Sequence, residues 1–248
     1  MKKIGLILKL KDILTLSLNS FELRRLKMGN VTILDGTTKY PLQKIGYNAG
    51  VCWGSPVDDM EKNINRAMDC INSGHGRVME YVDVELLIEG YSARVIREWY
   101  THIGGSPTRL QESTRYVDES NFNFVTPISL NQKQKEKYEE IMGNIAHGYK
   151  RLRELGVKKE DSAMVLPLGM TTKIVDKRNL RNLVDMSHQR LCTRAYCEYR
   201  ILMQEICKSL SSVSQEWEWI VDNLMKPKCE VLGHCTERKS CGRKHEYR

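Results

Sequence analysis

The segment from Asn179 to Leu210 most constrains the fold, because it contains no proline or glycine and carries the apolar spacing of a long helix. A second segment follows a different period. Between Val82 and Ile88, apolar residues alternate with polar ones, which predicts a strand with one buried face. Helical and strand periods in one chain predict a mixed α and β fold. With 248 residues and 41% hydrophobic residues, the chain is long and apolar enough to bury a core.

Other segments follow the same two patterns. Helical spacing predicts helices over residues 57–71, 92–102, 130–155 and 213–224, and β-branched runs predict short strands over residues 31–34 and 171–175. The segment 130–155 is the clearest of these helices, with Gly156 as its stop signal. Together they predict a mixed α and β domain.

The two ends of the chain differ from the middle. In residues 1–27, Lys9, Lys11 and Asp12 interrupt a short apolar run, and no small-residue cleavage site follows, so the pattern does not fit a secretory signal. Residues 227–248 are basic and rich in cysteine. We therefore predict an N-terminal extension over residues 1–27, a folded domain over residues 28–226 and a separate tail over residues 227–248.

The net charge of +8 and the pI near 9.0 predict an anionic partner, such as a nucleotide, a polynucleotide or a membrane surface. The basic residues are dispersed and lack interleaved aromatics, which weighs against nucleic acid. No segment reaches the roughly 20 apolar residues that a membrane helix needs. We predict a cytoplasmic protein that binds a nucleotide and neither a membrane nor nucleic acid.

Two polar segments are candidates for binding that anion. The loop from Gly105 to Tyr116 holds two arginines and four hydroxyl side chains, and arginine forks with loop amides suit a phosphate or carboxylate. Farther along, Arg181 and Asp185 share one helix face near Arg190. A solvated loop and an exposed ion-paired helix face explain the same patterns, so both alternatives stay open on composition alone.

A set of short motifs occurs in the order and spacing of one enzyme family. The motifs of the second half are Gly156-Val-x-x-Glu160, Val165-Leu-Pro-Leu168, Thr172, Asn179-x-Arg181-x-Leu183 and Arg190. Those of the first half are Gly74-His75, Glu80, Arg97-x-Trp99, His102 and Ser113-x-Arg115-Tyr116. Each fragment alone is weak, but the ordered set, which spans residues 31–210, resembles the flavin-dependent thymidylate synthases.

The resemblance implies the fold and the reaction. It implies an α/β (α+β) fold whose central, mostly antiparallel sheet is flanked by long helices, with residues 28–226 as the catalytic domain. It implies an enzyme that converts dUMP to dTMP, with methylenetetrahydrofolate as the one-carbon donor and FAD, reduced by NADPH, as the hydride source. In such enzymes the cofactor carries the difficult chemistry and the protein positions and polarises. It also implies a homotetramer with sites shared between subunits.

The resemblance also assigns residues to roles. Arg190 and Ser113 are implied as catalytic, with Arg190 stabilising negative charge that develops on the uracil. The implied nucleotide-binding residues are Gln111, Glu112, Ser113, Thr114, Arg115, Arg190 and Glu98. The implied flavin-binding residues are His75, His102, Asn179, Arg181 and Asp185, and Arg109 is a further candidate from the lengthened loop.

Several positions depart from the family pattern. The family motif begins Arg-His-Arg, whereas this chain has Thr101 and Ile103 on either side of His102. The loop from His102 to Arg115 is two residues longer, and Arg109 lies in the added segment. Ala163 stands where the family has a nucleotide-binding arginine, and Tyr81 where it has histidine; Glu98 replaces a glutamine. A lost charge-assisted contact costs on the order of 1.5 to 3 kcal/mol, so these changes bear on the substrate.

Cysteines in the tail predict a possible metal site. Cys229, Cys235 and Cys241 are evenly spaced and His245 follows, a ligand set that suits tetrahedral zinc, and thiolates also suit an iron–sulfur cluster. The usual short Cys-x-x-Cys knuckle is missing. A tail of reduced thiols without metal is the alternative.

Three functions remain open at this point. The leading hypothesis is the thymidylate synthase reaction on dUMP. The second is an enzyme that uses flavin and folate to methylate or hydroxymethylate another pyrimidine nucleotide. The third is a protein that binds a nucleotide or nucleic acid without turnover.

Overall fold

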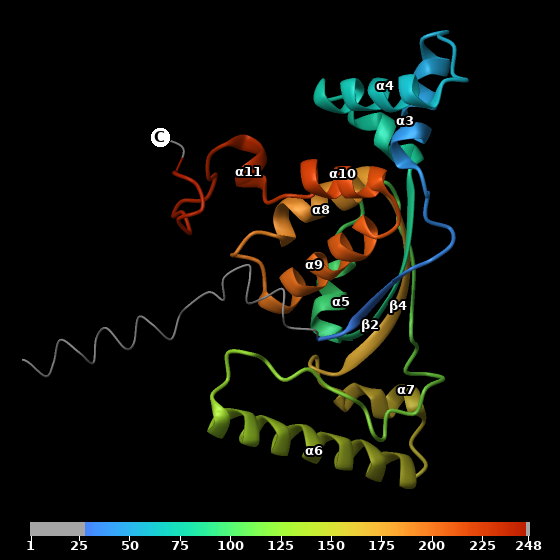
Figure 1. The fold of residues 1–248 in the computed structure, drawn as a ribbon. Helices are drawn as coiled ribbons and strands as arrows, with labels where there is room; N and C mark the ends of the chain where they lie inside the picture. Colours follow the sequence, from blue (N-terminus) through green and yellow to red (C-terminus); the bar gives the residue numbers. More distant parts are fainter. Residues whose placement is uncertain (1–27, 247–248) are drawn as a thin grey trace, which may run out of the picture.

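The computed structural model describes residues 28–246; the predicted extension over residues 1–27 lies outside the described residues. At the centre of the described part is a four-stranded antiparallel sheet with the strand order β1-β2-β4-β3 (Figure 1). The strands are β1 (Asn30–Ile33), β2 (Asp83–Ser92), β3 (Thr108–Gln111) and β4 (Thr171–Asn179). The predicted mixed fold with a mostly antiparallel sheet is confirmed.

Strands β2 and β4 form the middle of the sheet. They pair from Asp83 opposite Asn179 to Ser92 opposite Thr171, with a bulge at Gly90, whose φ of +75° favours glycine. Strand β4 is longer than the predicted segment 171–175, because its second half turns Asp176 and Arg178 toward the core. Hydrophobic alternation does not detect buried charges, so the sequence pattern ended too early.

Helices cover one face of the sheet and both of its ends. Helices α5 (Ala93–Trp99), α8 (Leu180–Arg190), α9 (Cys197–Ser211) and α10 (Gln215–Asn223) gather on one face (Figure 1) and bury the main core against it. The hairpin of α3 (Pro41–Cys52) and α4 (Met60–Asn72) lies at one end, with η1 (Gly76–Tyr81) after it. At the other end lie α6 (Gln132–Glu154), α7 (Lys159–Ser162) and η2 (Ala163–Val165).

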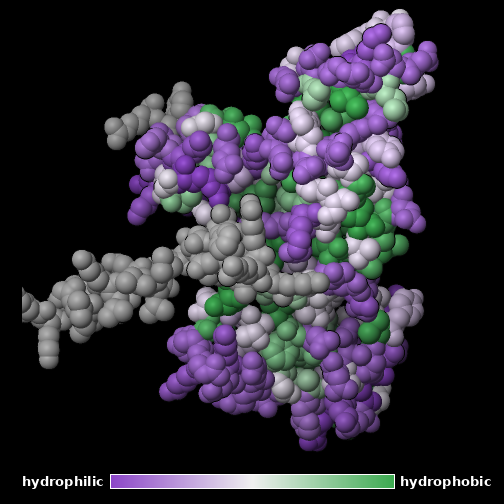
Figure 2. Space-filling view, viewed as in Figure 1, coloured by the Kyte–Doolittle hydropathy of each residue, from purple (hydrophilic) through white to green (hydrophobic). Residues whose placement is uncertain are grey.

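Helix α6 is mostly exposed. It buries only Met142 and Tyr149, and it forms a small second core with Phe122 and Met170. Figure 2 shows the consequence, a hydrophilic surface over this end of the molecule. Within residues 28–246, none of the helices combines the length and the apolar character that crossing a bilayer requires.

Most predicted helices are confirmed, but the longest is not. The segment 179–210 contains the last residue of β4, helix α8, a turn over residues 191–196 and most of helix α9. Tertiary contacts hold the turn without glycine or proline: the Arg200 guanidinium donates to the Thr193 carbonyl at 2.9 Å, and Arg194 pairs with Glu237 at 3.4 Å. The elements that were not predicted include α3 and the strand β3 inside the loop from Gly105 to Tyr116.

Candidate active site

The loop after α5 lies against the start of α8. Asn179 caps this helix, its side chain accepting a hydrogen bond from the Asn182 amide at 2.9 Å. A Cβ added to Gly105 would lie 2.2 Å from the Asn179 side-chain nitrogen, and one added to Gly104 would lie 2.9 Å from that of Asn182. Gly105 also has a φ of +70°. Only glycine fits this approach, which joins motifs that lie far apart in the sequence.

At the other end of α8, Arg190 is held by three contacts. Its Nε donates to Nε2 of His102 at 3.0 Å, and its Nη1 to the Glu98 carboxylate at 3.1 Å. Its guanidinium lies over the ring of Tyr199, 4.5 Å from the centroid. Three of the predicted site residues, Arg190, Glu98 and His102, therefore meet in one cluster.

The His102 imidazole is neutral at physiological pH. Burial, together with the nearby charges of Arg190 and Arg178, lowers its pKa from 6.5 to about 4. Because arginine has only donors, Nε2 of His102 accepts and Nδ1 carries the proton. The ring thus orients the guanidinium without repelling it.

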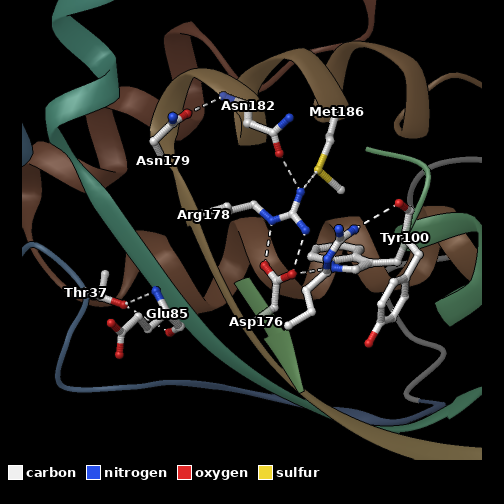
Figure 3. Close-up of polar contacts among 10 residues, drawn as sticks. Thr37, Glu85, Tyr100, Asp176, Arg178, Asn179, Asn182 and Met186 are labelled. Carbon is white, nitrogen blue, oxygen red and sulfur yellow. Dashed lines mark hydrogen bonds and ion pairs between the residues drawn. The ribbon is translucent and has the colours of Figure 1, made fainter. Parts of the chain in front are cut away.

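A buried ion pair lies beneath this cluster. Asp176 and Arg178, neighbours on the core face of β4, are joined by two hydrogen bonds of 2.6 and 2.7 Å (Figure 3). Trp99 Nε1 donates to Asp176 at 2.8 Å, and the Arg178 guanidinium donates to Asn182 at 2.6 Å. The network ties β4 to α5 and α8. Sequence reasoning missed it, although the alternation that places Ile174 inside also places both charged residues there.

The remaining flavin candidates lie on the exposed side of α8 and beside it. Arg181 donates to Glu80 at 2.6 Å, not to Asp185, which lies one turn later on the same exposed face. His75 is exposed and directly precedes η1, next to Gly76, whose added Cβ would lie 3.3 Å from Arg181. Arg109 points away from these residues, because it donates to the Tyr100 carbonyl at 2.9 Å and stacks on the Tyr100 ring.

The predicted phosphate-binding segment lies on a different part of the chain. Gln111 contacts Thr172 at 3.3 Å, and the Glu112 amide donates to the Lys173 carbonyl. Arg115 pairs with Glu160 at 2.9 Å, close to Ser113 and Thr114. No hydrogen bond or ion pair in the described part of the chain joins residues 111–116 to α8. One subunit therefore does not bring Ser113 and Arg190 into contact.

A cavity of about 710 Å³ opens beside the end of α8. Its volume lies in the usual range of ligand pockets, about 300–1,000 Å³. The tail forms its other wall and begins with α11 (Lys228–Leu232). The lining residues are Asp185, His188, Gln189, Arg190, Cys192, Thr193, Arg194, Ala195, Lys228, Cys229, Cys235, Thr236, Glu237 and Cys241.

The predicted metal site in the tail is not assembled. Cys229, Cys235 and Cys241 line the cavity, but His245 does not, and its carbonyl accepts from the Cys235 amide at 2.8 Å. Among residues 28–246, no three histidine, cysteine, aspartate or glutamate side chains are grouped closely enough to hold an ion. The wide spacing of the three cysteines explains the absence of a metal site, because the tail lacks the short Cys-x-x-Cys motif that commonly binds zinc.

Comparison with known proteins identifies the family. A family model described as thymidylate synthase complementing protein matches residues 33–214. A flavin-dependent thymidylate synthase of Pyrococcus furiosus is 30% identical over 227 residues, covering 85% of this chain and 91% of the relative. One from Nitratidesulfovibrio vulgaris is 32% identical over 185 residues, covering 70% and 73%. One from Clostridium tetani is 28% identical, covering 84% and 92%. The chain belongs to the flavin-dependent thymidylate synthase family.

Proposed function

We propose that this chain converts dUMP to dTMP, with methylenetetrahydrofolate as the one-carbon donor and NADPH-reduced FAD as the hydride source. The observation that carries the proposal is the cluster of Arg190, Glu98 and His102. The Arg190 guanidinium is partly buried there and is held by the Glu98 carboxylate, the neutral His102 ring and the face of the Tyr199 ring. A charge fixed in this way stabilises negative charge developing on a substrate ring without reorganisation.

The residues along α8 fit a flavin dinucleotide. Arg181 is half exposed and uses one donor on Glu80, so most of its five N–H groups remain for phosphate or ring acceptors. Asp185 offers an exposed acceptor for hydroxyl or amino groups, and it lines the adjoining cavity. Asn179, His102 and His75 complete the set. Reduced FAD, when bound, supplies a hydride; the protein positions it and the nucleotide.

In this proposal, the segment with Ser113 and Arg115 binds the phosphate of the nucleotide. The guanidinium of Arg115 is exposed and holds Glu160, an ion pair that costs little to exchange for a phosphate. Since this segment makes no polar contact with α8 in one chain, a shared site is proposed, in which a second subunit supplies the partner half. Large exposed apolar side chains between α7 and β4 support a subunit interface: Met164 and Leu168.

A second candidate acts on another pyrimidine nucleotide. Where the family motif has two arginines around histidine, the hydroxyl of Thr101 donates to the Glu98 carbonyl at 2.7 Å, and Ile103 is 70% exposed. Neither side chain carries a charge, so contacts to substrate or flavin differ at this edge of the site. The same flavin and folate chemistry on a different base is the alternative.

A substrate panel tests the proposal. The purified protein is expected to carry a flavin absorbance band that NADPH bleaches, which excludes binding without turnover. In the presence of methylenetetrahydrofolate, dUMP is expected to accelerate flavin reoxidation more than dCMP or UMP does. Acceleration by another pyrimidine nucleotide and not by dUMP would transfer the assignment to the second candidate. Arg190→Ala and Ser113→Ala are expected to lower turnover on the order of 10²-fold or more, while His147→Ala, on the exposed side of α6, leaves it unchanged.

A further inference from the structure

We propose that the C-terminal tail is a wall of the flavin site, with Lys228, Cys229 and Cys241 facing the bound FAD. This inference rests on the proposed function and adds residues to it that no family motif contains. The family model ends at residue 214, so the tail lies outside the residues that this model matches.

The tail is fastened to the turn that follows α8. Arg194 pairs with Glu237 at 3.4 Å and donates to the Lys239 carbonyl at 2.6 Å. From the tail, Arg243 donates to the Leu191 carbonyl at 3.5 Å and pairs with Glu230 at 3.4 Å. Contacts in both directions hold the tail against the helix end and keep the cavity between them open.

The cavity enclosed in this way reaches two of the candidate site residues. Its walls include Asp185 and Arg190 from α8, and Lys228, Cys229 and Cys241 from the tail. A ligand that contacts Asp185 from this side therefore meets the tail as well. A ligand bound outside the cavity would leave the tail untouched, and this difference makes the proposal testable.

The basic residues that line the cavity favour binding of an anionic part of the ligand. Of the basic residues that line the cavity, Arg190 pairs with Glu98 outside the wall and Arg194 pairs with Glu237, whereas no ion pair among residues 28–246 involves Lys228. The exposed ammonium of Lys228 is free to meet the diphosphate of FAD, at a site whose family motif has lost cations at Thr101 and Ile103.

The thiols provide a direct probe. Four of the eight cysteines, Cys192, Cys229, Cys235 and Cys241, line this one cavity. Cys241 is exposed, and the Thr193 hydroxyl beside it lowers the pKa of its thiol, which favours reaction with alkylating agents. Cys52, exposed at the end of α3 in the hairpin beyond the sheet, is a matched control on the same molecule (Figure 1).

Alkylation of the full-length protein with iodoacetamide, with and without FAD, tests the proposal. With FAD at about 100 times its Kd, only roughly 1% of sites are free, so alkylation of Cys241 is expected to slow on the order of 10-fold or more. Mass spectrometry of peptides measures each cysteine separately. The rate at Cys52 is expected to stay constant.

A charge variant supplies a second readout. Lys228→Glu is expected to weaken FAD binding about tenfold, measured by quenching of flavin fluorescence, since one charge-assisted contact is lost. Lys208→Glu, an exposed lysine on α9, is the control and should bind normally. If FAD binds but Cys241 is not protected and Lys228→Glu binds normally, the tail is not part of the site and the proposed function stands. If FAD does not bind at all, both the proposed function and the proposed role of the tail are wrong.

Discussion

At the scale of single residues, Tyr199 is the support on which the Arg190 cluster rests. Its ring is fully buried, stacks beneath the guanidinium of Arg190 and meets the His102 ring edge-on with centroids 6.3 Å apart. Its hydroxyl has no hydrogen-bond partner within the part of the chain that the structure describes. The aromatic ring, and not the hydroxyl, is therefore the part that positions the site.

Replacing the ring tests this positioning role. Tyr199→Ala is expected to lower the free energy of unfolding by about 3–5 kcal/mol and to lower kcat, because the cavity leaves Arg190 unsupported. Tyr199→Phe keeps the ring and is expected to change the stability by less than about 1.5 kcal/mol and to retain turnover. Urea unfolding and steady-state kinetics measure both. Equal loss of kcat in the two variants would contradict the role of the ring.

His102 gives the protein a specific pH dependence. Its pKa is about 4 in the folded protein and near 6.5 in the unfolded chain, so between these values the unfolded chain binds more protons. The free energy of unfolding therefore falls as the pH drops from about 6.5 to 4. In His102→Gln this part of the dependence is expected to vanish, as urea unfolding midpoints across that range would show. Parallel curves for the two proteins would argue against a depressed pKa.

At the scale of elements, the junction of β4 with α5 and α8 depends on the buried pair of Asp176 and Arg178. Removing one partner leaves a buried charge unpaired, so Arg178→Leu is expected to destabilise the protein by about 3–5 kcal/mol. Adding Asp176→Asn to that variant removes the unpaired charge and is expected to restore part of the loss. Thermal or urea unfolding measures both, and a double variant less stable than the single one would contradict this account.

The same junction shows what the sequence could and could not predict. Regular apolar spacing identified α4, α6, α10 and β2, because their buried faces are hydrophobic. The second half of β4 buries charges, and the turn between α8 and α9 is held by Arg200 and Arg194 without glycine or proline. Such elements are determined by partners far along the chain, which local patterns do not contain.

The candidate site, too, could be predicted from the sequence only in part. Ordered motifs and spacing pointed to Arg190, His102, Glu98 and Asn179, which the structure brings together along α8. Tyr199 and the cavity wall formed by the tail carry no motif, so they emerge only from packing. The flavin-binding role of Arg109 remains a prediction. In the structure its guanidinium donates to the Tyr100 carbonyl.

At the scale of the whole molecule, the separation of residues 111–116 from α8 predicts that activity depends on assembly. If one subunit supplies Ser113 and another supplies Arg190, two inactive variants can complement each other. Coexpressed Ser113→Ala and Arg190→Ala chains are expected to regain part of the wild-type activity, because mixed oligomers contain some intact sites. Each variant assembled alone is the control. No regained activity in mixed oligomers would place both residues in one subunit's site.

An anaerobic single-turnover measurement tests most directly whether this protein converts dUMP to dTMP. The protein is loaded with FAD, reduced with NADPH, freed of excess NADPH and mixed with dUMP and methylenetetrahydrofolate, while flavin absorbance and dTMP are followed together. The wild-type protein is expected to form dTMP in proportion to the flavin reoxidised, and Arg190→Ala is expected to give neither signal. Flavin that binds and is reduced, but is reoxidised without dTMP being formed, would contradict it.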